Sequence, residues 1–460
     1  MNVATRQSEL RAQLKEALEA SDAARAWSLL TPHEGSLAVD REITMLWLEM
    51  LRLTPTRPSL MGEVELVLSN LGNDPEIVIA ANAALLAAAS LRAPDEPPLH
   101  QDGPAHRAAR AAEACLKTLT NEQRRDPRIG GYLYANLGNA YRLMEPSKEN
   151  DQKSHQAFYE ALQIDDSNGD WWHDLGLLHK WRGRFDNAYA AFLKARARLG
   201  ETRPVLFNLA ICATALGEGD LAGGSFKALG LPVELSADSK LPYVPGLPPA
   251  QVRVLSRGAG YLTGSVLPDK ATAFEVLYVQ PLSPCHGVVI SPSFRDAPID
   301  YGDLILFDPA PVSTSRDQDG SIVPCFPLLE ILNRGDERRM RFIAHEGTKG
   351  SLDRLESDLP EGFKLFRQRE IVKSARHPER AIASSDDERP LIHGKIVATS
   401  TADLGALRKL LEGGQITRSE LAMAIPELYE LLGDTKRAGQ EHQAYRGIER
   451  RATRDERTLN

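Results

Sequence analysis

The chain has 460 residues, of which 42% are hydrophobic and 26% are charged, and its formal net charge is −8. This length suits two or three domains that each bury a core, and the composition is typical of a globular chain rather than a disordered one. The acidic balance argues against a general nucleic-acid binder, because phosphate contacts require a basic surface; net charge does not test for a local basic patch.

The sequence also gives no sign of a membrane, a secretory signal or a metal centre. No apolar run approaches the roughly 20 residues that span a bilayer, and the N-terminal residues lack the pattern of a signal peptide. We therefore expect a cytoplasmic protein with no membrane partner. The four cysteines lie far apart with no CxxC pair, which supports neither a disulfide framework nor a zinc ribbon, and no cofactor is predicted. They are Cys115, Cys212, Cys285 and Cys325.

Helical periodicity extends from the N-terminus to about residue 235. Apolar residues recur at three- and four-residue spacing from Leu10 onward, and Ala and Leu are abundant. We interpret residues 1–131 as degenerate helical pairs with an exposed loop at 93–104. Several prolines follow the helices, so residues 236–250 are predicted to be a linker.

Large, small and aromatic residues recur with a period of 34 residues inside this region. The first helix of one unit carries Leu175 and Gly176, and its second helix carries Phe192; the same classes return at Leu209, Ala210 and Phe226. An earlier unit around Gly138 is four residues longer in its turn. Over residues 132–235 this pattern resembles the tetratricopeptide repeat.

The resemblance implies a stacked helical solenoid whose concave face binds protein partners. By the family's geometry, one face of the first helices would contact a partner's peptide or helix. Arginine and lysine would pair with carboxylates, asparagine would bond backbone amides and the aromatic rings would supply rigid contact area. A purely structural helical domain with an ordinary solvated face is the alternative. The predicted partner-binding residues are Asn139, Arg142, His173, Lys180, Trp181, Phe207 and Asn208.

Residues 251–400 read as a β-rich module, because short β-type runs alternate with Pro, Gly and Asp. We expect a small β-barrel or a sandwich-like domain. The Gly-Asp-strand unit at 301–308 resembles small barrels that include self-cleaving repressors and signal peptidases, which use a Ser nucleophile and a Lys base. The candidates are Ser291, Ser293 and Lys395, but no motif pairs them.

Cys285 beside His286 is the other suggestive pair in this module. Adjacent strand residues point to opposite faces, and a metal would need Cys325, His345 or His393 at no recognised spacing. A buried cysteine and a turn histidine are the preferred interpretation. Phosphate-binding glycine loops, HExxH and GxSxG motifs are absent from the sequence.

Helical periodicity returns over residues 401–460, where Tyr429, Gly433 and Ala438 look like half a repeat. Half a repeat leaves its apolar face uncovered, so we expect it to pack on the β module, on the solenoid end or on another subunit. The predicted fold is mainly α, with a helical solenoid, a β-rich module and C-terminal helices. The predicted function is a non-enzymatic scaffold. The alternative is a hydrolase or metal-dependent enzyme in the β module, with the repeats recruiting substrate.

Overall fold

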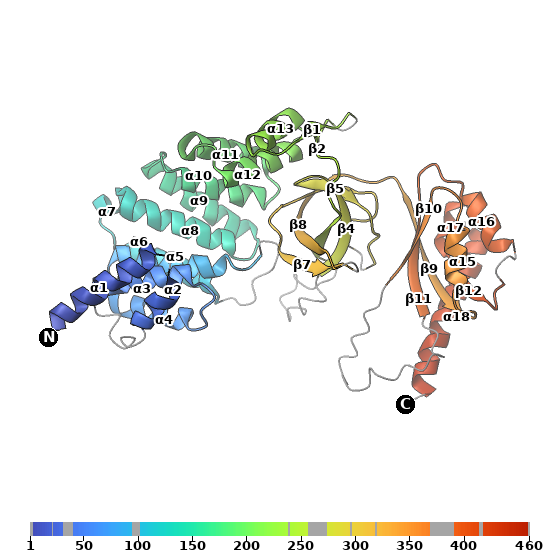
Figure 1. Ribbon diagram of the computed structural model, residues 1–460, viewed down its shortest axis with the longest axis horizontal. Coiled ribbons are helices and arrows are strands. Elements are labelled where there is room, and N and C mark those ends of the chain that lie inside the picture. The colour runs from blue at the N-terminus through green and yellow to red at the C-terminus, as the bar shows by residue number, and fades with distance from the viewer. Residues whose placement is uncertain are drawn as a thin grey trace.

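The computed structural model shows a chain built from a helical solenoid, a β-barrel and a C-terminal α/β module (Figure 1). The helices form a curved stack from α1 to α13, and the barrel lies between this stack and the C-terminal module. The structure describes residues 3–20, 22–30, 40–93, 102–237, 240–255, 274–294, 297–317, 320–368, 391–413 and 417–458.

The solenoid consists of successive antiparallel helices. Its elements are α1 (Val3–Glu19), α2 (Ala23–Leu30), α3 (Arg41–Leu53), α4 (Leu60–Leu71), α5 (Pro75–Ala89), α6 (Pro104–Thr118), α7 (Asn121–Arg125), the π-helix η2 (Pro127–Gly131), α8 (Tyr132–Leu143), α9 (Lys148–Ile164), α10 (Gly169–Lys180), α11 (Phe185–Leu199), α12 (Arg203–Ala215) and α13 (Gly219–Ala228). Capping side chains and prolines determine where several of these helices begin. Asn168 accepts hydrogen bonds from two backbone N–H groups of α10, and proline occupies the first turn of α5 and α6.

Close packing within each pair explains why the repeat pattern requires small residues. A Cβ atom on Gly176 would lie 2.6 Å from the ring of Phe192, and one on Gly138 would lie 2.9 Å from the ring of Phe158. Both rings are fully buried. The pairs α8–α9, α10–α11 and α12–α13 therefore confirm the predicted tetratricopeptide-like solenoid.

A closed barrel follows the solenoid, as the sequence predicted. Its strands run in the order β3-β4-β5-β6-β8, and a parallel pairing between β3 and β8 closes the ring. Neighbouring strands are otherwise antiparallel, and β7 pairs with the first residues of β8, from Ile322 to Cys325. The strands are β3 (Ala250–Leu255), β4 (Phe274–Ser283), β5 (His286–Val289), β6 (Leu304–Phe307), β7 (Ser313–Arg316) and β8 (Ile322–Asn333), and a short hairpin of β1 (Glu234–Leu235) and β2 (Pro242–Tyr243) precedes them.

The remaining strands form a second, separate sheet that the sequence did not distinguish from the first. Its chain order is βαββαβ and its strand order is β10-β11-β9-β12, all antiparallel, which is the ferredoxin-like arrangement. Its elements are β9 (Arg338–Glu346), α15 (Ser351–Ser357), β10 (Phe363–Arg367), β11 (Leu391–Ala398), α16 (Leu404–Glu412) and β12 (Leu421–Ala424).

The C-terminal segment differs from the expected run of helices because it supplies β12 to this sheet. The strand has the sequence LAMA, whose Ala and Met favour helix, so pairing with β9 overrides local propensity. Helices α17 (Pro426–Leu431) and α18 (Thr435–Thr458) follow it. Leu428, Tyr429 and Ala438 join the hydrophobic core of this sheet, so the half-repeat packs on the β part of its own chain.

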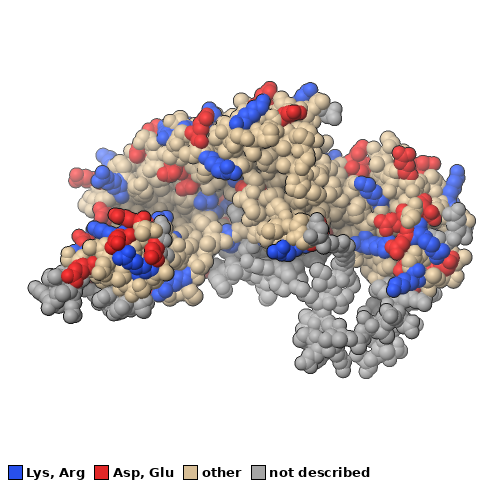
Figure 2. Space-filling model, viewed as in Figure 1, with Lys and Arg blue, Asp and Glu red and all other residues tan. Residues whose placement is uncertain are grey.

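The face of the molecule shown in Figure 2 carries interspersed charges of both signs over the N-terminal helices and the C-terminal module, and few over the barrel. In the described part of the chain, none of the helices is both long enough and apolar enough to cross a bilayer.

Candidate functional site

A row of linked polar side chains runs across α8, α10 and α12 and ends at the barrel. We call this row the polar face, and it consists of Asn139, Arg142, His173, Asp174, Lys180 and Asn208. Because α8, α10 and α12 are the first helices of successive pairs, equivalent positions on them lie side by side. The face therefore joins three repeats into one surface.

The upstream end of the polar face combines an arginine with a carboxylate. Arg142 donates from Nε and Nη2 to Oδ1 of Asn139, at 3.0 and 2.7 Å. The Nδ2 atom of Asn139 donates to Oδ2 of Asp174 at 2.6 Å, which connects α8 to α10. Burial lowers the pKa of the Arg142 guanidinium, while the nearby Asp174 carboxylate acts in the opposite direction.

The downstream end is a buried ion pair that attaches the barrel. Lys180 is 4% exposed, and its Nζ donates to Oδ1 of Asn208 at 2.7 Å and to Oδ2 of Asp308 at 2.6 Å. Asp308 directly follows β6 of the barrel, and its other carboxylate oxygen accepts from the backbone N–H of Ala310. Lys180 is thus neutralised and bonded by groups from two domains, which a buried charge requires.

A histidine links the two ends. Nε2 of His173 lies 3.2 Å from Nδ2 of Asn208, and its Nδ1 lies 4.0 Å from Oδ1 of Asp174. Burial lowers the pKa of His173, so the ring is neutral at pH 7 and accepts the hydrogen bond from the Asn208 amide.

The structure connects five of the seven predicted partner-binding residues in this network. Trp181 lies beside it, with its ring 5.2 Å from Nζ of Lys180. Phe207 packs instead against Phe226 of α13, with ring centroids 6.3 Å apart, and against the guanidinium of Arg203. The contact of these residues with a partner stays a prediction.

Lys180 and Asn208 face the chain's own barrel rather than an open groove. Both side chains are buried, so a partner would reach them only after the barrel moves. Sequence reasoning placed these residues on the groove side because the repeat resemblance describes a solenoid without an attached domain. It could not show that the domain encoded downstream fills this end of the face.

Two residues that bond to the polar face were missed by the sequence analysis. Asp174 bonds Asn139 across 35 positions, which is close to one repeat, so comparison of neighbouring repeats could have found it. Asp308 pairs with Lys180 across 128 positions, and no local pattern signals a contact of that range.

The side chains of Cys285 and His286 are both buried. Sγ of Cys285 lies 3.6 Å from the hydroxyl of Thr214 in α12, and burial raises the pKa of the thiol to about 11. Nδ1 of His286 lies 2.6 Å from Oγ of Ser283, and burial lowers the pKa of the imidazole to about 4. A thiol with a raised pKa is a poor nucleophile. Within the described residues, no group of three or more His, Cys, Asp or Glu side chains could hold a metal ion.

The serines and the lysine considered for a hydrolase each have another partner. The Ser293 hydroxyl donates to Glu275 at 2.7 Å, and the Ser291 hydroxyl accepts from the backbone N–H of Tyr278. Lys395 forms an ion pair with Asp300 at 2.8 Å. The hydrogen bonds of these three side chains do not link them to one another.

No protein-family model matches the sequence, and no curated protein matches it either. Solved structures with a likeness to part of this chain include the following two. The MamA protein is 16% identical, with 40% of this chain and 88% of that chain covered at a TM-score of 0.29. A thermophilic tetratricopeptide repeat protein of Thermus thermophilus is 16% identical, with 45% of this chain and 97% of that chain covered at a TM-score of 0.34.

Proposed function

We propose that this chain is a non-enzymatic scaffold that binds a segment of a protein partner along the polar face of its solenoid. The observation that supports this function best is the contrast between the two ends of that face. The hydrogen bonds of Arg142 and Asn139 stay within the solenoid, whereas Lys180 is buried against the barrel. The half-buried upstream end is therefore the part that a partner can reach.

The chemistry of the upstream end suits a peptide. An arginine in a half-buried position binds a partner's carboxylate more strongly than an exposed one, because the surrounding protein screens the charge less. The Asn139 amide can bond a peptide backbone, and Asn136 lies one turn earlier on the same helix face. We infer that the partner segment carries an acidic side chain opposite Arg142.

In this proposal the barrel limits the length of the binding face. It contacts the polar face at Lys180 and Asn208, so a bound segment would extend from there toward α5. The barrel and the ferredoxin-like module then supply further surfaces on the same chain, which is what a scaffold requires.

Photo-crosslinking in the native cell tests this function. A photoreactive phenylalanine analogue at position 136 should crosslink a partner protein, whereas the same analogue at Tyr159, which is exposed on α9, should not. Arg142→Ala should lower the yield at position 136 roughly tenfold, as expected for the loss of a charge-assisted contact, with an unchanged helical circular dichroism signal. Equal crosslinking from positions 136 and 159 would overturn the proposal.

A further inference from the structure

The ferredoxin-like sheet has two faces, one against its helices and one turned toward the barrel (Figure 1). Side chains alternate between the faces along each strand. Met340 and Phe342 of β9, Leu365 of β10 and Ile396 of β11 join the hydrophobic core with α15 and α16, so the residues beside them in sequence point the other way. We call the surface that these outward side chains form the basic face, and it consists of Arg339, Arg341, Lys364, Phe366 and Lys395.

The basic face places like charges directly opposite each other. Phe366 of β10 pairs with Lys395 of β11, and Lys395 pairs with Arg341 of β9, so the three side chains lie side by side. In the described strands β9, β10 and β11, every charged side chain on this face is basic, although the whole chain has a net charge of −8. Two cations at opposite strand positions repel each other, so the face needs an anion from outside the sheet.

In this structure the loop that precedes β6 of the barrel supplies such an anion. The Asp300 carboxylate lies 2.8 Å from Nζ of Lys395, and Lys364 donates to the Tyr301 hydroxyl at 2.9 Å. The Tyr301 ring packs on Phe366 with ring centroids 5.4 Å apart. The loop therefore brings a ring to the phenylalanine and a negative charge to the lysine beside it. A nucleotide offers the same two groups, as its base and its phosphate.

The loop can leave this face without unfolding either module. Among the described residues, the hydrophobic core of the barrel and that of the ferredoxin-like module are separate clusters. The linker between β8 and β9 is bonded to Asp303, which accepts from the backbone N–H of Gly335 at 2.9 Å and from Nη1 of Arg334 at 2.8 Å. A turn about this linker would withdraw Tyr301 from Phe366 while the modules stay joined.

Arg341 is the part of the basic face that is already open to solvent. Its side chain is 72% exposed and pairs with Glu427 at 2.6 Å, and an exposed pair of this kind contributes little to stability. Arg339 instead donates to the carbonyl oxygen of Tyr301 and lies beside Asp303, so it belongs to the joint with the barrel. Arg341 can therefore make the first contact with an anion, before the loop leaves.

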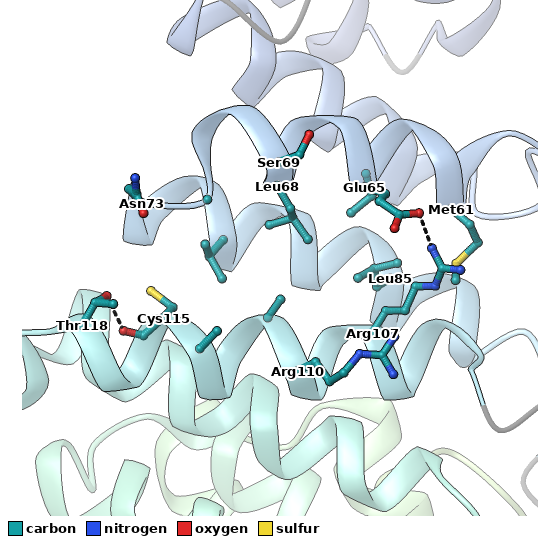
Figure 3. Close-up of a pocket in the computed structure, with 15 residues that line it drawn as sticks. Met61, Glu65, Leu68, Ser69, Asn73, Leu85, Arg107, Arg110, Cys115 and Thr118 are labelled. Atoms are coloured by element: carbon teal, nitrogen blue, oxygen red, sulfur yellow. Dashed lines mark hydrogen bonds and ion pairs between the residues drawn. The ribbon is translucent and has the colours of Figure 1, made fainter.

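The groove between α4, α5 and α6 is the contrasting case (Figure 3). Arg107 and Arg110 at one end of it pair with Asp102, and Arg107 also pairs with Glu65. All four residues lie in the solenoid, so no movement between modules frees these arginines. The anion beside Lys395, by contrast, comes from the barrel, which is a separate module.

We propose that the basic face binds single-stranded nucleic acid and that the Asp300–Tyr301 loop competes with it from within the same chain. A base would replace the Tyr301 ring on Phe366, and phosphates would take the ammonium groups of Lys364 and Lys395. A single strand fits this geometry because its bases are free to stack on a flat sheet, whereas those of a duplex are already stacked. The proposal goes beyond the scaffold function above, because it assigns a second class of partner to a different module.

Fluorescence anisotropy of the full chain with a labelled oligouridylate of about 12 nucleotides tests this binding. Tyr301→Ala removes the competing ring and hydroxyl and should raise the affinity roughly tenfold over wild type. Asp300→Asn, which keeps the loop and removes its charge from Lys395, should raise the affinity several-fold. The proposal is overturned if neither variant binds the oligonucleotide, or if both bind it with the wild-type affinity, because the loop then does not compete.

A matched pair of charge reversals locates the bound strand. Lys364→Glu should lower the affinity of the Tyr301→Ala chain at least roughly tenfold. Lys409→Glu makes the same charge change at an exposed position of α16, on the helix side of the same module, and should leave the affinity unchanged. Equal losses in both variants would mean that the oligonucleotide binds elsewhere, which contradicts the proposal.

Stacking distinguishes nucleic acid from an acidic protein segment. Phe366→Ala should weaken oligouridylate binding by the Tyr301→Ala chain roughly fivefold or more, because one base loses its stacking partner. Polyglutamate of the same length carries the charge without bases and should bind at least roughly tenfold more weakly than the oligouridylate. Equal affinity for both polymers, insensitive to Phe366→Ala, would overturn the proposal in favour of an acidic segment of a protein.

Discussion

The barrel contacts its two neighbours through surfaces of opposite character. Toward the solenoid, Cys285 and Leu306 belong to the same hydrophobic core as α11 and α12, and the Lys180–Asp308 pair is buried beside them. Toward the ferredoxin-like module, the contacts are individual ones: an ion pair whose side chains are 13% and 22% exposed, a hydrogen bond and a ring contact. Lys395 pairs with Asp300 at 2.8 Å, Lys364 donates to the Tyr301 hydroxyl, and Tyr301 packs on Phe366 with ring centroids 5.4 Å apart.

This difference indicates which parts of the chain unfold together. A shared hydrophobic core makes two domains one cooperative unit, because exposing either one exposes the other. Among the described residues, the hydrophobic cores of the barrel and of the ferredoxin-like module are separate clusters. The barrel should therefore unfold with the solenoid, and the ferredoxin-like module should unfold on its own.

The largest effect is expected from breaking the buried ion pair. Asp308→Ala leaves the Lys180 ammonium buried without its counter-ion, which should lower the free energy of unfolding of the solenoid–barrel unit by about 3–5 kcal/mol. Urea denaturation followed by circular dichroism measures this loss. The double variant Lys180→Met, Asp308→Leu should recover most of it, because both charges are removed and both apolar side chains fit a buried site. Wild-type stability of the single variant would argue against a tight junction.

A smaller effect is expected from acid, through His286 in the same junction. Its pKa of about 4 lies below the value of about 6.5 for an unfolded histidine, so the folded chain binds fewer protons between these values. Stability should therefore be full above pH 6.5 and should be lost as the pH falls toward 4. The loss for one such group is at most roughly 3 kcal/mol. His286→Gln should flatten the pH dependence of the unfolding free energy. If this pH dependence stays the same in the variant, the buried His286 ring is not its source.

The smallest effect is expected at the second junction. Lys395→Ala should cost at most about 1 kcal/mol, because its pair with Asp300 is partly solvated. Raising the salt from about 0.05 M to about 0.5 M should weaken this junction further by screening, with little effect on the buried Lys180–Asp308 pair. Small-angle scattering at both salt concentrations measures the separation of the modules. Equal salt sensitivity at both junctions would show that the barrel contacts its two neighbours in the same way.

The solenoid could be predicted from the sequence more fully than the β-rich part of the chain, for a physical reason. The spacing of Gly138, Gly176 and Ala210 reports contacts between residues close in sequence, so the helical pairs and their small-residue packing could be read directly. The strands were also visible as short apolar runs. Their division into two sheets was not, because β9 pairs with β11 and β12 across long stretches of chain.

The candidate site shows the same limit. The residues of the polar face could be predicted from equivalent positions in neighbouring repeats, and five of the seven join one network. The burial of Lys180 could not be predicted, because it depends on Asp308, which lies in another domain.

Amide hydrogen exchange of the full chain under increasing denaturant tests the central claim most directly. If solenoid and barrel are one unit, α12 and β6 should exchange with the same opening free energy, and β9 should exchange with a different one. Asp308→Ala should lower the shared value for α12 and β6 and leave β9 unchanged. Exchange of β6 together with β9, independent of α12, would contradict the account and place the barrel with the ferredoxin-like module.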